Sequence, residues 1–360
     1  MAVASGSTAS KRNLDVNTIF ANRLRLNLYT SFTGKDRLQT RLQAINITPF
    51  STAVTGTNMT RLAFDGNNNN NDFLQKLEYR FPLSSQAVVY LSATGGEFND
   101  NMFNFNPGFD PSGNGALSRF GRFNPIYRES AEGTGATFNY SFNKALTLSL
   151  GYMTRPSVAS NPVNKFGLYD GSYAALAQLA FQPTNNLNLG FTYVHSYYNP
   201  AGGVQVSGTT GSVFANQPFG NIATSANHYG LQANFRLNPT ISLSGWVGYT
   251  IAIAEDSTTT NVTRGDNAEI WNWAVTLGLS DVGSEGSFLG FIFGMPPKVT
   301  SNDINTRKDK DTSYHLEAFY RYRLNDNIAI TPGGFVIFNP EHNSSNNNIY
   351  VGSVRITYSF

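Results

Sequence analysis

Apolar and polar residues alternate with a period of two along nearly the whole chain, and this feature constrains the fold most. Near the start, Leu24, Leu26 and Leu28 share one parity, whereas Arg23 and Arg25 share the other. Successive side chains of a strand point to opposite faces, so each such segment predicts a strand with one apolar and one polar face. Roughly 15 segments of about 9 to 13 residues show this pattern. Strands of water-soluble proteins are usually nearer 5 or 6 residues, and about 10 tilted residues cross a bilayer's hydrocarbon layer, so the length indicates membrane-spanning strands.

The connections between these segments alternate between short and long. The short ones lie near residues 33–36, 82–86, 141–144, 183–185, 238–240, 280–286 and 325–327. The long ones lie near residues 46–71, 95–130, 155–170, 198–225, 254–266, 295–311 and 339–347. Outer-membrane barrels have short periplasmic turns and long external loops. The sequence therefore predicts an all-β fold, an antiparallel transmembrane β-barrel of about 16 strands.

Aromatic residues of the apolar parity gather at the segment ends, as in the two aromatic girdles of membrane barrels. The expected inner-rim set is Phe81, Tyr140, Phe181, Phe235, Tyr322 and Phe360. The expected outer-rim set is Tyr152, Tyr193, Tyr229, Tyr249, Trp271, Tyr314 and Tyr350. Charged residues make up only 13% of the chain, which suits a wall that exposes an apolar face.

Strand parity predicts how the chain is divided. The last segment runs from a long loop to the C-terminus, and single-chain bacterial barrels have an even number of strands. We therefore expect residues 1–19 to be the remnant of a first strand, ending at residues 2–5, followed by the first external loop. Residues 20–360 then form the barrel, and the connection at 95–130 is its third and longest external loop.

The polar face is mainly cationic. An arginine on the lipid face would cost about 2 to 4 kcal/mol at the bilayer midplane, so these side chains should line a wet lumen. The predicted pore-lining residues are Arg23, Arg25, Arg37, Arg41, Lys76, Glu78, Arg80, Arg236, Glu317, Arg321, Arg323 and Arg355. Rings of basic side chains attract anions, which predicts some anion preference. The alternative is that these arginines pair with acidic loop residues and brace the wall.

Several segments resemble the cyanobacterial outer-membrane porins known as iron-uptake porins, of the carbohydrate-selective porin superfamily. The resemblance lies in SFTGKDRLQTRLQ (31–43), SRFGRFNPIYRES (118–130), FNKALTLSLGYM (142–153), the long run 169–198 and the closing VRITYSF (354–360). It covers nearly the whole chain and is moderately specific, because these motifs are structural and identify the barrel better than its solute. It implies an outer-membrane location, outer-membrane lipid as surroundings and a homotrimer. Other members carry a signal peptide, a peptidoglycan-binding domain and a coiled coil, which are not visible here.

The third loop carries the candidate constriction. In general porins the corresponding loop folds into the barrel and narrows it, and the matching motif brings this expectation to Arg119, Arg122 and Arg128. The six phenylalanines of the loop favour the folded-in conformation, because they need apolar partners. The alternative is a plain surface loop.

The sequence favours a passive channel over an enzyme. The four histidines are scattered without metal-ligand spacing, there is no cysteine, and neither a nucleophile elbow nor a dinucleotide glycine motif is present. We expect no cofactor, no metal site and no nucleic-acid partner. The expected function is diffusion of small hydrophilic solutes and inorganic ions, with iron among them by resemblance. The alternative is a structural anchor of the outer membrane in a longer form of the protein.

Overall fold

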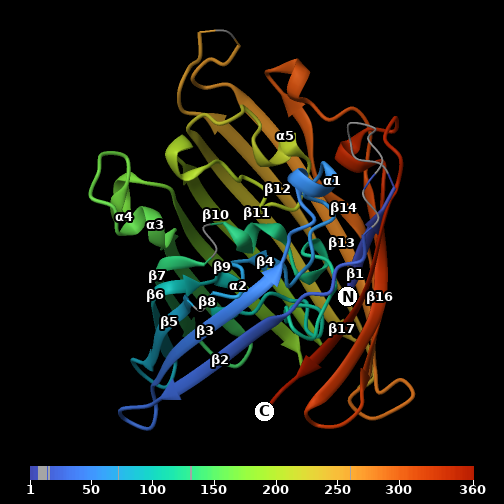
Figure 1. The fold of residues 1–360 in the computed structure, drawn as a ribbon. Coiled ribbons are helices and arrows are strands. Elements are labelled where there is room, and N and C mark those ends of the chain that lie inside the picture. The colour runs from blue at the N-terminus through green and yellow to red at the C-terminus, as the bar shows by residue number, and fades with distance from the viewer. Residues whose placement is uncertain (7–13, 15–16, 72, 130–131, 260) are drawn as a thin grey trace.

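The computed structural model describes residues 1–6, 14, 17–71, 73–129, 132–259 and 261–360. These residues form one sheet of 17 strands curved into a barrel (Figure 1). The strands are β1 Ala2–Ser5, β2 Arg23–Thr30, β3 Arg37–Ile47, β4 Gly66–Asn67, β5 Phe73–Pro82, β6 Ala87–Gly96, β7 Gly133–Ser141, β8 Leu146–Thr154, β9 Tyr173–Thr184, β10 Leu187–Tyr198, β11 Thr224–Arg236, β12 Ile241–Ala254, β13 Asn267–Ser280, β14 Phe288–Asn302, β15 Tyr314–Arg323, β16 Ile328–Phe338 and β17 Ile349–Tyr358.

Helical structure is confined to short pieces in the loops. The α-helices are α1 Thr52–Thr55, α2 Phe98–Asn101, α3 Pro156–Ala159, α4 Gly167–Asp170 and α5 Val213–Asn216. The 3-10 helices are η1 Phe120–Arg122, η2 Pro125–Arg128, η3 Pro200–Gly202, η4 Asn305–Arg307 and η5 Pro340–His342. No helix among the described residues has the length and apolar character needed to cross a bilayer.

Each long strand pairs antiparallel with its neighbours in sequence, and β1 brings the two ends of the sheet together. β1 pairs with β17 from Ala2 opposite Ser353, and Ala2 also forms an antiparallel bridge with Ile19, just before β2. The two-residue β4 lies in the loop after β3, and setting it aside leaves 16 wall strands. The predicted all-β antiparallel barrel is confirmed. Residues 7–13 and 15–16 of the predicted N-terminal segment, and Ser130 of the third loop, lie outside the described residues.

The outward face of the wall is apolar. Leu24, Leu26 and Leu28 of β2 are between 44% and 55% exposed, as expected of side chains that face lipid rather than a protein core. Aromatic rings follow one another around the rim near the long loops, with Tyr249 of β12 and Trp271 of β13 only 4.5 Å apart between centroids. Such belts suit the membrane–water boundary, where one end of the ring is wet.

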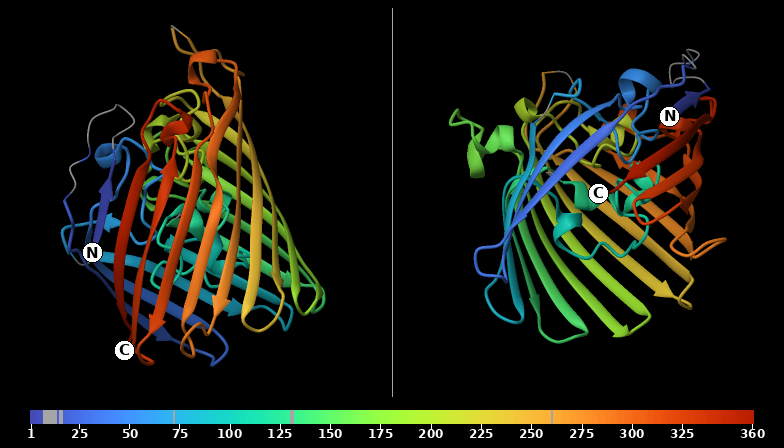
Figure 2. Two further views of the ribbon diagram at one scale, coloured as in Figure 1. Left: turned by 90° about the vertical axis from the view of Figure 1, so that its right-hand side faces the viewer. Right: turned by 60° about the horizontal axis from the view of Figure 1, so that its bottom comes forward.

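The apolar interior is formed by the loop after β6, residues 97–129, which lies inside the barrel (Figures 1 and 2). Phe109 of this loop packs edge-on against Phe288 of β14 and Phe319 of β15, and Phe120 packs against Trp246 of β12. The wall leaves space for these rings: a Cβ on Gly190 of β10 would lie 2.3 Å from the Phe105 ring. We call residues 97–129 the inner loop.

One predicted boundary is wrong. The sequence suggested that the strand before residue 311 ends near Met295, but β14 continues to Asn302 through Pro296 and Pro297. The prolines are tolerated because the register with β13 shifts between Trp271 and Trp273. The pairing of β14 with β15 also ends at Gly294, so the missing N–H groups interrupt no ladder on that side.

Candidate functional site

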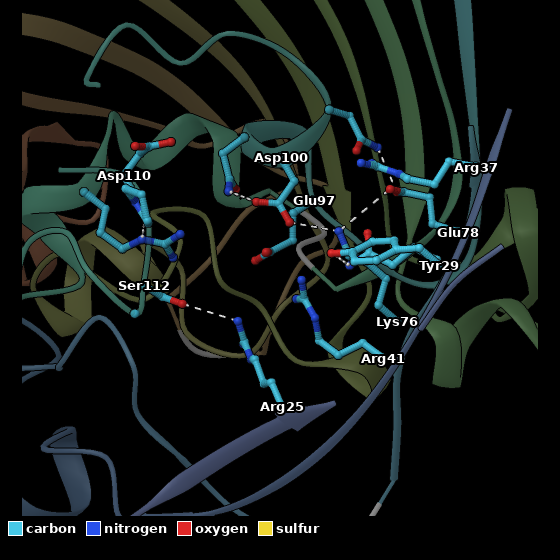
Figure 3. A pocket seen from close by; sticks show the side chains of 16 residues that line it. Arg25, Tyr29, Arg37, Arg41, Lys76, Glu78, Glu97, Asp100, Asp110 and Ser112 are labelled. Atoms are coloured by element: carbon cyan, nitrogen blue, oxygen red, sulfur yellow. Dashed lines mark hydrogen bonds and ion pairs between the residues drawn. The ribbon is translucent and has the colours of Figure 1, made fainter. Parts of the chain in front are cut away.

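A cavity of about 410 Å³ lies inside the barrel between one part of the wall and the inner loop (Figure 3). The wall side consists of Arg25, Tyr29, Arg37, Gln39, Arg41, Lys76 and Glu78. The loop side consists of Glu97, Asn99, Asp100, Asn101, Asp110, Pro111, Ser112, Gly113 and Arg122. Strand alternation explains the wall side, since residues of the polar parity on β2, β3 and β5 all point inward. The barrel is narrowed here by polar and charged groups.

The guanidinium groups of the wall are held by neutral side chains. Arg25 Nε donates to Gln43 Oε1 at 2.6 Å, and Arg41 Nε donates to Asn27 Oδ1 at 2.7 Å. Arg37 stacks over the Tyr29 ring, 5.6 Å from its centroid. These contacts orient the guanidinium groups, and the partners of Arg25 and Arg41 carry no charge.

The carboxylates of the inner loop lie opposite. Asp100 accepts from Lys76 Nζ at 2.8 Å, and Glu78 lies 3.9 Å from the same ammonium. Burial alone would raise the pKa of Asp100, but the Lys76 ammonium lowers it below its ordinary value. Burial raises the pKa of Asp110, whose carboxylate accepts from Asn104 at 3.2 Å. Glu97 points toward the wall arginines across the cavity (Figure 3).

Strands β15 and β17, which follow β1 and β2 around the barrel, hold the inner loop through its backbone. Glu317 of β15 accepts from the Leu117 N–H at 2.5 Å and from the Ser118 N–H at 3.2 Å. Arg355 of β17 donates to the Gly115 carbonyl at 2.7 Å, and Arg321 donates to the Asn114 carbonyl at 3.0 Å. Charge-assisted bonds of this kind are the stronger ones, so these strands fix the middle of the loop to the wall.

The predicted pore-lining residues therefore divide into groups. Arg25, Arg37, Arg41, Lys76 and Glu78 line the cavity. Arg23 donates to Ser112 at its edge at 3.2 Å. Glu317, Arg321 and Arg355 hold the inner loop, and Arg80, Arg236 and Arg323 lie toward the short turns, where Arg323 pairs with Asp326 at 2.6 Å.

The three arginines predicted for the constriction take different positions. Arg122 lines the cavity and donates through Nε to the Asp110 carbonyl. Arg119 instead donates to the Gly208 carbonyl at 3.3 Å, in the loop after β10. Arg128 is buried, stacks on Phe123 at 4.3 Å and donates to the Arg119 carbonyl at 2.8 Å. The sequence brings these residues into one loop, and the structure places only Arg122 of the three among the cavity lining.

Sequence reasoning missed the acidic half of the cavity. Glu97, Asp100 and Asp110 occur in the same loop as the phenylalanines that predicted its inward packing. A loop that enters the lumen brings its charged side chains with it. Those three acids could therefore have been predicted to lie inside the barrel. These acids face the basic wall because of the path that the loop takes. That path is irregular, so no periodic pattern in the sequence predicts it.

Two Ser–His–Glu groupings inside the barrel lack the geometry of a catalytic triad. His315 Nε2 lies 3.2 Å from Ser118 Oγ and 3.1 Å from Glu317 Oε2, so both partners share one ring nitrogen. In a triad the serine and the acid contact different nitrogens. His228 Nε2 likewise serves both Ser196, at 2.8 Å, and Glu129, at 3.8 Å. Both histidines are fully buried, and both brace the inner loop against the wall.

A second cavity, of about 580 Å³, lies between the inner loop and β6 to β10. Met102, Phe103 and Phe105 of the loop give it an apolar surface, and its polar groups are mainly amides, including Asn139 and Gln178. Asp100 and Asn101 border both cavities. The lumen therefore has a charged side and a more neutral side.

A family profile described as "Carbohydrate-selective porin, OprB family" matches residues 2–360. An uncharacterized protein of Synechocystis is 41% identical over 358 residues, covering 95% of this chain and 64% of the relative. An uncharacterized protein of Nostoc is 37% identical over 367 residues, covering 96% of this chain and 61% of the relative. The chain thus spans less than two thirds of the length of these relatives.

Solved porin structures share the fold. OprB of Pseudomonas putida superposes with a TM-score of 0.62 at 13% identity, covering 100% of this chain and 92% of the other. The anion-selective porin of Comamonas acidovorans gives a TM-score of 0.56 at 10% identity, covering 100% and 96%. OmpT of Vibrio cholerae, in its trimer form, gives 0.57 at 8% identity, covering 99% and 96%. At these identities the likeness concerns the fold alone.

Proposed function

The chain belongs to the OprB family of carbohydrate-selective porins, which are outer-membrane β-barrels and not enzymes, and we propose that it forms a water-filled channel for passive diffusion of small hydrophilic solutes and inorganic ions. The observation that carries the proposal is the polar cavity between the inner loop and the basic wall. A loop fixed across the lumen by charge-assisted bonds narrows a channel without closing it. Diffusion through such a constriction needs no cofactor and no conformational cycle.

The charges around the cavity support a preference for anions. Lys76 is paired with Asp100, whereas Arg25 and Arg41 are held only by neutral groups. Basic side chains with low-dielectric walls raise the local concentration of anions. The bracing role expected as an alternative applies to Arg321 and Arg355, which hold loop carbonyls.

Planar-bilayer recording tests the proposal. Purified, folded protein should give stepwise conductance, and in a potassium chloride gradient the reversal potential should indicate that chloride is the more permeant ion. Arg122→Gln should lower that selectivity, whereas Arg119→Gln, which changes a side chain outside the cavity lining, serves as the matched control. Folded protein that inserts into the bilayer without conductance steps contradicts the channel.

Iron would cross this channel as a small ion or complex among other solutes. Within the described part of the chain, no group of three His, Asp or Glu side chains is placed to hold a metal ion. Isotope uptake into liposomes that contain the protein measures this directly. Uptake of ferric citrate that saturates at low concentration would argue instead for a dedicated iron site.

The second cavity favours a second class of solute, neutral sugars. Phe103 and Phe105 provide apolar rings, and Asn139 and Gln178 provide amide donors and acceptors, a combination that suits polyhydroxylated molecules. The family description is consistent with this class. Liposome swelling in isotonic glucose should exceed swelling in a disaccharide, and Phe103→Ala should change the two rates unequally. The sugar proposal is wrong if glucose and the disaccharide give equal swelling rates, both with the parent protein and with Phe103→Ala.

We also propose a homotrimer that contacts through the face of β2, β3 and β5. This face exposes leucines, among them Leu26 and Leu74, whereas the chain of contacting aromatic rings runs from β8 to β15. Leu26→Arg should dissociate the oligomer while the barrel stays folded. Native mass spectrometry in detergent measures the oligomer, and a monomeric parent protein contradicts the proposal.

A further inference from the structure

The guanidinium groups of Arg25, Arg41 and Arg122 have hydrogen-bond capacity left over toward the cavity. Arg25 donates to Gln43 and, at 3.4 Å, to Ser112, and Arg41 donates to Asn27 and Gln75. Arg122 uses its Nε on a backbone carbonyl and lies over the Phe123 ring at 4.8 Å. Each guanidinium has five N–H donors, so several remain for a ligand. No carboxylate among the described residues lies within ion-pair distance of these three groups.

The acids around the cavity are mostly engaged elsewhere. Asp100 is taken by Lys76 and by Asn99, and Glu78 accepts from Ser92 at 2.6 Å and from Asn101 at 3.0 Å. Asp110 accepts from Asn104, and burial favours its protonated form by raising its pKa. Glu97 is the acid that faces the guanidinium groups of Arg25 and Arg41, which form no ion pair with the described residues (Figure 3). The positive charge of the wall is therefore incompletely compensated.

From this arrangement we propose that Arg25, Arg41 and Arg122 form a binding site for a small oxyanion of the phosphate or sulfate type, a proposal that rests on the channel function proposed above. The planar fork of a guanidinium matches two oxygens of an oxyanion at once, which a spherical halide cannot offer. The cavity of about 410 Å³ is large compared with the roughly 30 Å³ that a water molecule occupies in the liquid. The anion therefore keeps much of its water, and its binding stays weak enough for passage.

The position of Glu97 predicts which substitutions should strengthen anion binding and which should weaken it. Its carboxylate competes with an incoming anion for the same guanidinium groups and repels that anion across the cavity. Glu97→Gln removes the repulsion with little change in shape and should strengthen binding three- to tenfold. Arg41→Gln removes one of the three guanidinium groups that hold the anion and should weaken anion binding at least tenfold. Arg236→Gln, on an exposed residue near the short turns, changes the same net charge without touching the cavity and is the matched control.

The test uses the full chain folded in detergent and reconstituted in planar bilayers. Isothermal titration with sodium sulfate and with inorganic phosphate at low ionic strength measures binding, and the chloride current in the presence of added sulfate measures its effect on passage. We expect saturable binding, partial block of chloride current by sulfate, the changes given above for the two cavity variants, and no change for Arg236→Gln.

The two proposals fail separately. Absent chloride steps contradict the channel, and titration in detergent still reports on the oxyanion site. Normal chloride steps with no saturable sulfate or phosphate binding overturn the oxyanion site and leave the channel intact. Should Arg41→Gln not fold, Glu97→Gln decides alone: unchanged or weaker sulfate binding in that variant overturns the proposal.

Discussion

At the scale of single residues, neighbours decide what a lumen-facing charge does. Arg25 and Arg355 both have the polar parity of their strands, yet Arg25 faces an open cavity and Arg355 is covered by the inner loop, whose carbonyls it holds. Parity is a property of the strand and can be read from the sequence. The partner depends on where an aperiodic loop passes, so it cannot be read from the sequence in the same way.

Glu317 offers a residue-scale prediction. Its carboxylate accepts two backbone N–H groups of the inner loop and also contacts His315. In Glu317→Gln an amide NH₂ faces one of those donors, and a hydrogen bond to a charged group contributes about 1.5–3 kcal/mol. We expect the inner loop to loosen, which should give noisier single-channel currents and a lower thermal unfolding midpoint. Glu285→Gln, at an exposed short turn, is the control. Currents as quiet as those of the parent would show that the loop is held without this carboxylate.

At the scale of elements, regular strands were predictable and their interruptions were not. Alternation located the wall strands because side-chain direction in a strand has a period of two. The continuation of β14 through Pro296 and Pro297 was missed, because a proline pair normally indicates a strand end and the sequence does not reveal the register shift that accompanies these prolines. The inward path of the inner loop was predictable from its phenylalanines, which would be costly in an exposed loop.

The long loops above the barrel contain buried carboxyls that should respond to pH. Burial raises the pKa of Asp309 to about 6, against hydrogen bonds from the Val299 N–H at 2.7 Å and from Ser212 Oγ at 2.8 Å. Burial likewise raises the pKa of Glu341 to about 7, although the Val213 N–H donates to it at 2.6 Å. These contacts join residues 303–313 and 339–348 to α5. The loops in place therefore bind protons more tightly than the same loops opened into water, where carboxyls titrate near pH 4.

The sign of the pH effect follows from those raised pKa values. Loop closure is most stable below about pH 4, weakens as pH rises from there through about 6 and 7, and is then constant. Each carboxyl contributes at most about a tenfold increase in the opening equilibrium per pH unit in that range. Hydrogen exchange of residues 303–313 and 339–348, divided by the rate of unstructured peptides, should rise between pH 5 and 8. The double variant Asp309→Asn, Glu341→Gln should lack this rise, and a parent protein whose corrected exchange is independent of pH would contradict the assignment.

At the scale of the whole molecule, the apolar outer face and the charged lumen are the two sides of the same strands. One alternating pattern therefore gives the wall an apolar outer face and a polar inner face, which is why the barrel could be predicted from the sequence. The net charge of the chain is only +2, so any ion preference must come from where the charges lie. The basic wall and the acidic loop lie on opposite sides of one cavity, and this separation is invisible in composition.

That separation predicts how selectivity depends on salt. The Debye length is about 10 Å at 0.1 M ionic strength and about 3 Å at 1 M, so the field of Arg25 and Arg41 should reach across the lumen only in dilute salt. We expect the permeability ratio of chloride to potassium to fall toward the ratio of their free mobilities between about 0.05 M and 1 M. Reversal potentials at a fixed tenfold gradient, measured at several mean concentrations, give this ratio. In the double variant Arg25→Gln, Arg41→Gln the ratio should start lower and change less. A parent ratio that stays constant over this range would mean that ions are selected by direct contact with side chains, because contact distances are too short to be screened.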